Sequence, residues 1–72
     1  MWIFTKDSAI NTDNVLIIAV DGSGVDFVVT SINTTTTIDC GTPDRAKYIY
    51  NDIISELGKG SLIFNVDRRL SK

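Results

Sequence analysis

Six consecutive apolar residues, Val15 to Val20, constrain this chain more than any other feature of its sequence. Their short length and β-branched side chains favour a strand over a buried helix segment. Because side chains alternate along a strand, Leu16, Ile18 and Val20 are predicted to share one face of the sheet, opposite the other three. Both faces of this strand must therefore be covered, and one helix can cover only one of them.

The chain of 72 residues has room for one domain, spanning residues 1–72. A domain this short hides only about 60% of the surface of its unfolded chain, and small domains usually add disulfides, a metal or a partner subunit. Cys40 is the only cysteine and there is no histidine, which argues against a disulfide within the chain and against a zinc site. We therefore expect a homo-oligomer, most simply a dimer, with Leu16, Ile18, Val20 and Phe64 at its interface.

Four strands are predicted ahead of the helix: Trp2–Thr5, Val15–Val20, Val25–Ile32 and Thr35–Cys40. Two glycines within Asp21–Gly24 can adopt positive φ, which is the strongest hairpin signal in the chain. A turn near Asn33 joins the third strand to the threonine-rich fourth. A short final strand is predicted at Leu62–Val66, and the six residues after it are polar enough to fray.

The residues from Pro43 to Leu57 are predicted to form the one substantial helix. Thr42 suits the N-cap and Pro43 the first helical position, while Gly58 suits a left-handed C-terminal residue. Apolar residues at helical spacing form one stripe. These are Ala46, Ile49, Tyr50, Ile53 and Leu57. The predicted fold is α+β, an antiparallel β-meander of about four strands packed on one C-terminal helix with a short final strand.

Charge is distributed unevenly. Residues 1–58 carry three cations and eight carboxylates, whereas residues 59–72 carry four cations and one carboxylate. The four cations are Lys59, Arg68, Arg69 and Lys72. A basic tail on an acidic body is the basis for an alternative hypothesis, a small nucleic-acid-binding accessory protein. Four cations make a small electrostatic footprint, so nucleic acid is the weaker of the two hypotheses.

No motif in the sequence predicts catalysis, a cofactor or a metal. Cys40 lies two residues before the helix N-cap, where a helix can lower a thiol pKa, but a small core residue is the simpler interpretation. Asp21–Gly24 lacks most of the ligands of a calcium loop. Without histidine, no conventional nucleophile–base pair can be assembled. We therefore expect a non-enzymatic, self-associating protein-interaction module.

Localisation is predicted from what the sequence lacks. No apolar run approaches the ~20 residues that span a bilayer. The opening residues have no positive region of the kind that begins a signal peptide. A lone free thiol is typical of a reducing compartment, so the expected location is the cytoplasm.

Several segments together resemble small uncharacterised bacterial and phage proteins, in which a strand meander is closed by one helix. The segments that carry the resemblance are Met1–Thr5, Asn11–Val15, Thr42–Ala46, Ile53–Leu57 and Gly60–Val66. The Asp21–Gly24 hairpin and the threonine run depart from that pattern. The resemblance implies a fold and no catalytic residue, because no activity is established for these proteins.

Overall fold

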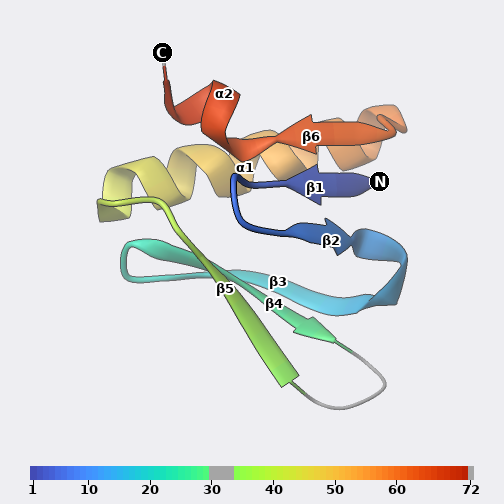
Figure 1. Cartoon of the computed structure of the whole chain (residues 1–72), viewed down its shortest axis with the longest axis horizontal. Helices are drawn as coiled ribbons and strands as arrows, with labels where there is room; N and C mark the ends of the chain where they lie inside the picture. The colour runs from blue at the N-terminus through green and yellow to red at the C-terminus, as the bar shows by residue number, and fades with distance from the viewer. Residues whose placement is uncertain (30–33, 72) are drawn as a thin grey trace.

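The structure is a computed structural model that describes residues 1–29 and 34–71. The strands are β1 (Trp2–Phe4), β2 (Ala9–Asn11), β3 (Val15–Asp21), β4 (Gly24–Val29), β5 (Thr34–Asp39) and β6 (Ile63–Asn65). The helices are α1 (Pro43–Lys59), α2 (Val66–Leu70) and a 3₁₀ turn, η1 (Thr12–Asn14). The α+β class, the antiparallel meander and the single main helix are thereby confirmed (Figure 1).

The strands are divided between two sheets, which the sequence did not predict. Sheet A has the order β2-β1-β6 and sheet B the order β3-β4-β5. In sheet A, β1 pairs antiparallel with β2 and parallel with β6, so that Trp2 lies beside Ile63. The first strand was predicted to join the meander, but it pairs instead with the strand that follows α1.

Sheet B is the predicted meander, with three strands. The hairpin between β3 and β4 turns through two residues, and Gly22 has a φ of 58° that favours glycine. The register shifts between Val15 and Ile17, which makes Leu16 the extra residue of a β-bulge. The predicted strand end at Ile32 and the turn at Asn33 lie outside the described residues.

Helix α1 begins as predicted and ends later. The Thr42 side chain accepts a hydrogen bond from the Arg45 N–H at 3.2 Å, and Pro43 occupies the first turn. The helix continues past Gly58 because Gly60 supplies the left-handed residue, with a φ of 76°, and donates its N–H to the carbonyls of Glu56 and Leu57. Gly58 as the terminating residue was therefore wrong by two positions.

One core is shared by both sheets and α1. It comprises Ile3, Ile10, Val25, Ile38, Cys40, Ala46, Ile49, Ile53, Phe64 and Val66. In Figure 1, α1 crosses behind β1 and β6, with the strands of sheet B below it. Ile49 and Ile53 are fully buried as predicted, whereas Leu57, at the end of the same stripe, is 36% exposed.

The last residues of the described chain form a helix where fraying was predicted. The Asn65 side chain caps α2 by accepting a hydrogen bond from the Arg68 N–H at 3.0 Å. Val66, the first residue of α2, is buried in the core. A cap and one buried anchor hold this short helix against the body of the domain.

Candidate interaction surface

The outer face of sheet A exposes large apolar side chains beside two asparagines, Asn11 and Asn65. Alternation along β1 buries Ile3 and turns Trp2 and Phe4 outward, and alternation along β6 buries Phe64 and turns Ile63 outward. Trp2 is 46% exposed and Ile63 is 66% exposed, while Leu62, just before β6, is 79% exposed. We use the name Trp2 face for Trp2, Phe4 and Ile63, which point outward from sheet A, together with Leu62, which is exposed at the start of β6.

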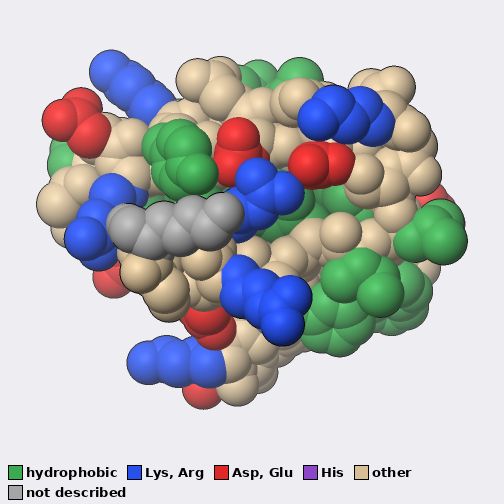
Figure 2. Space-filling model, turned by 90° about the horizontal axis from the view of Figure 1, so that it is seen from above, with side chains coloured by type: hydrophobic (Ala, Val, Ile, Leu, Met, Phe, Trp, Pro, Cys, Tyr) green, Lys and Arg blue, Asp and Glu red, His purple; other side chains and the backbone are tan. Residues whose placement is uncertain are grey.

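The aromatic residues of the Trp2 face contact one another. The rings of Trp2 and Phe4 stack with centroids 6.4 Å apart and planes at 27°. Viewed from the side of α2 and β6, hydrophobic side chains gather at the end of the molecule where β6 begins, while charged side chains occupy the middle (Figure 2). Contiguous apolar surface of this kind marks interaction sites in soluble proteins.

The bulge in β3 determines how the residues of the predicted interface are placed. After Leu16 the alternation is reset, so that Val15, Ile18 and Val20 share the inner face and pack against the core. Phe64 is only 2% exposed and belongs to the core itself. Phe64 is therefore not available as surface, Ile18 and Val20 are partly buried against the core, and the side chain of Leu16 lies outside the described part of the chain.

The outer face of sheet B carries more polar groups. Ile17 is 51% exposed there, but Asp26 and Thr37 lie two positions along on the same face, and the Thr37 hydroxyl donates a hydrogen bond of 2.6 Å to the Asp26 carboxylate. Thr35 and Thr37 are both exposed. Some apolar residues of the Val15–Val20 run thus pack against the core, and the outer face of sheet B is exposed to solvent.

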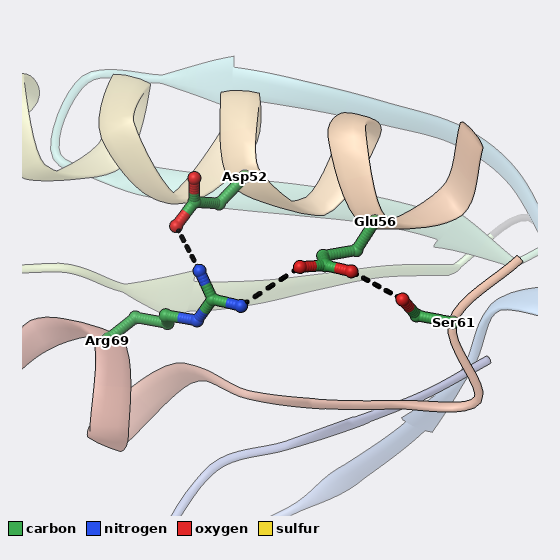
Figure 3. Close-up of polar contacts among 4 residues, drawn as sticks. All are labelled: Asp52, Glu56, Ser61 and Arg69. Carbon is green, nitrogen blue, oxygen red and sulfur yellow. Dashed lines mark hydrogen bonds and ion pairs between the residues drawn. The ribbon is translucent and has the colours of Figure 1, made fainter. Parts of the chain in front are cut away.

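One cation of the C-terminal segment is engaged within the domain. The Arg69 guanidinium donates hydrogen bonds to Asp52 at 2.9 Å and to Glu56 at 3.1 Å, one turn apart on α1 (Figure 3). It also lies over the Phe64 ring, 5.0 Å from the centroid. We call this set of contacts the Arg69 clasp, because it ties α2 to α1.

The clasp also changes the titration of Glu56. The Ser61 hydroxyl donates to the second Glu56 oxygen, and this bond, followed by the one from Arg69, lowers the pKa of the Glu56 carboxyl. Glu56 is therefore held ionised, and both of its oxygens are occupied. The cluster is a structural tie with no reactive group left unpaired.

The four cations of the nucleic-acid hypothesis are not brought together as a free patch. Arg69 is compensated by two carboxylates, whereas Lys59 and Arg68 are exposed at the end of α1 and on α2. Lys72 lies outside the described residues. The footprint that a phosphate backbone would contact is accordingly smaller than the sequence suggested.

Cys40 is a buried residue of the core. Its Sγ lies 3.8 Å from the Ile38 carbonyl oxygen. Burial, with a further contribution from the neighbouring Asp39 carboxylate, raises the pKa of the Cys40 thiol. The shift is opposite in direction to the one a reactive thiolate needs.

Within residues 1–29 and 34–71, no group of His, Cys, Asp or Glu is arranged to hold a metal ion. No helix in that part of the chain is long and apolar enough to cross a membrane. Comparisons with protein-family models, with curated proteins and with solved structures find no match.

Sequence reasoning missed the Trp2 face. Trp2–Thr5 was recognised as a strand, but no face was assigned to its aromatic residues. The available signal was the spacing of Trp2 and Phe4, two residues apart and therefore on one side of a strand, with apolar Ile3 on the other. A strand that is apolar on both sides needs cover on both sides, as was argued for Val15–Val20.

Proposed function

We propose that this chain is a non-enzymatic protein-interaction module that self-associates through the Trp2 face. The observation that supports the proposal is the exposure of Trp2, Phe4 and Ile63 side by side on one sheet, extended by Leu62. The four residues carry no charge, so two copies of the face can meet without burying an unpaired ion. Closed two-fold pairing uses the same patch on both chains.

The size of the face sets the expected affinity. From the exposed fractions of its side chains, the Trp2 face offers roughly 400 Å² of apolar surface. Two such faces bury roughly 800 Å² in total, which lies below the range of stable dimers and within that of weak, transient ones. We therefore expect a reversible dimer with a Kd of about 10–100 µM.

The aromatic pair is expected to contribute most of the binding energy. Trp and Tyr are enriched among the residues that dominate interfaces, because large rigid rings lose little entropy on burial. Sheets that pack face to face lie about 10 Å apart, a distance that lets the Trp2 and Phe4 rings of the two copies interdigitate.

Sedimentation equilibrium between about 5 and 500 µM tests the proposal, since the Kd expected for a weak interface lies within that range. The average mass should rise from 7.9 kDa toward twice that value. Trp2 is the only tryptophan, so its emission should move to shorter wavelength as the dimer forms. Added salt should not weaken the dimer, because no ion pair holds it. A constant 7.9 kDa species with unchanged emission would refute self-association through this face.

A further inference from the structure

The outer edge of β5 is open. In the described chain β5 pairs only with β4, in a regular antiparallel register without a bulge. The Cys40 N–H donates to the Ser23 carbonyl at 2.9 Å, so Cys40 faces β4, and alternation fixes the rest of the strand. Thr35, Thr37 and Asp39 therefore direct their N–H and C=O groups away from β4, toward the open edge.

This edge lacks the devices that block added strands. At the edges of the two sheets, β2 and β6 are three residues long, and β3 is interrupted by its bulge. β5 is six residues long, and from Thr34 to Ile38 it carries no charge and no proline. Among the described strands it is the edge best suited to accept another strand.

A hollow of about 390 Å³ adjoins the last residues of β5. Its lining comes from the β1–β2 turn, from Thr37 to Asp39 of β5 and from the first two residues of α2. The lining residues include three aspartates, Asp7, Asp39 and Asp67, and one lysine, Lys6, and none of the four joins an ion pair within the described residues. The hollow lies within the size range of ligand pockets, and its lining carries a net negative charge.

We propose that the β5 edge and this hollow form a groove that binds an extended segment of a partner protein as an added strand. Backbone hydrogen bonds with Thr35, Thr37 and Asp39 would supply the pairing, as in other cases of β-augmentation. A Lys or Arg side chain of the segment occupies the hollow, where Asp39 and Asp67 balance its charge.

A second copy of this chain fits the groove less well than a basic segment. β5 contains no Lys or Arg, so a second β5 would bring a threonine to the hollow and leave its carboxylates uncompensated. The groove also belongs to a different sheet from the Trp2 face. The two proposals therefore stand or fall separately.

Two capped peptides test the groove. Each alternates threonine and valine over seven positions, one with lysine at both ends and the other with glutamate. Titrated into ¹⁵N-labelled protein, the lysine peptide should shift the amide signals of Thr35, Thr37 and Asp39 and bind at least ~10-fold more tightly than the glutamate peptide. If neither peptide binds at millimolar concentration, or if the shifts map to Trp2 and Phe4 instead, the proposal is wrong.

Three variants separate the edge from the hollow. Thr35→Pro removes an N–H that faces the open edge and no hydrogen bond to β4, so it should abolish binding and leave the fold intact. Thr35→Ala is the matched control and should bind normally. Asp39→Asn combined with Asp67→Asn should erase the preference for lysine over glutamate, whether or not Thr35→Pro folds. Unchanged binding by Thr35→Pro, or an unchanged preference in the double variant, would overturn the assignment.

Discussion

Sheets A and B contribute to the same core, but their outer faces differ in polarity. Ile3 and Phe64 of sheet A meet Val25 and Ile38 of sheet B in one cluster with α1. On the outside, sheet A shows stacked aromatic rings, whereas sheet B shows a threonine hydrogen-bonded to an aspartate. The apolar residues of the inner faces are explained by the core that they form. The difference between the outer faces needs a separate explanation.

The two sheets differ in how far they bury their apolar side chains. In sheet B, one bulge redirects the apolar run so that Val15, Ile18 and Val20 all reach the core. Sheet A has three-residue strands and no such adjustment, and its apolar residues remain on both sides. The outer face of sheet B therefore needs no cover, whereas the outer face of sheet A is covered, on our proposal, by a second copy of the chain.

The largest expected effect tests whether the two sheets form one cooperative unit. Ile53→Asp places a charge in the shared core, at a cost that exceeds the ~5 kcal/mol stability typical of small domains, so the whole domain should unfold. Ile54→Asp, one residue along and exposed, should fold normally. Circular dichroism and amide exchange are the measurements. Retained protection in β4 with loss in β1 would mean that the sheets are independent.

The next effect compares the two faces of sheet A. Phe64→Ala removes a buried ring and should lower the free energy of unfolding by about 3–5 kcal/mol. Phe4→Ala changes the outward ring and should cost the monomer less than about 1 kcal/mol, while weakening self-association. Urea titration below the dimer Kd measures both. Equal losses of stability would show that Phe4 serves the core and not a partner.

A pair of exposed isoleucines compares the outer faces directly. Ile63→Lys on sheet A should raise the dimer Kd at least ~10-fold, which is about 1.4 kcal/mol. Ile17→Lys on sheet B introduces the same charge at a similarly exposed position and should leave the Kd unchanged. Sedimentation of the two variants at matched concentration decides the matter. If Ile17→Lys dissociates the dimer and Ile63→Lys does not, the interface lies on sheet B.

The smallest effect concerns acid. The pKa of Glu56 is lowered from its ordinary value of 4.5, so its stabilising contribution is complete above that pH and is lost as the pH falls through the lower folded-state pKa. Because the Arg69 clasp covers Phe64, amide exchange in β6 should accelerate below pH 4.5 before exchange in β4 does. In the Glu56→Gln variant, the amides of β6 should exchange faster already at pH 7, and the loss of their protection should depend less on pH. Equal acceleration in both strands would indicate global acid unfolding instead.

Local signals in the sequence predicted the local structure. Thr42 and Pro43 marked the start of α1, and the glycines of Asp21–Gly24 marked the hairpin, because capping and turn chemistry act over a few residues. The later end of α1 at Gly60 was within the error of such reasoning, since Gly58 offers the same conformational freedom.

Pairing between distant segments was not predictable in the same way. The residues near Trp2 do not specify that its partner on the adjacent strand is Ile63. No residue type in the sequence predicts the bulge at Leu16. The face assignment of Ile18 and Val20 depended on that one extra residue, because a slip of one position exchanges the two sides of a strand. The spacing of Trp2 and Phe4 places both on one side of a strand, but the extension of that face by Ile63 depends on the pairing of β1 with β6.

The parallel pairing of β1 with β6 also has a consequence for protein synthesis. The Trp2 N–H bonds to the Leu62 carbonyl, so β1 lacks its parallel partner β6 until residues 62–65 have left the ribosome. The hairpin of sheet B can form much earlier, because closing a short loop costs less entropy than closing a long one. Until β6 has been synthesised, β1 therefore has a partner on one edge only, the neighbouring strand β2, and we expect chaperones to bind this aromatic strand.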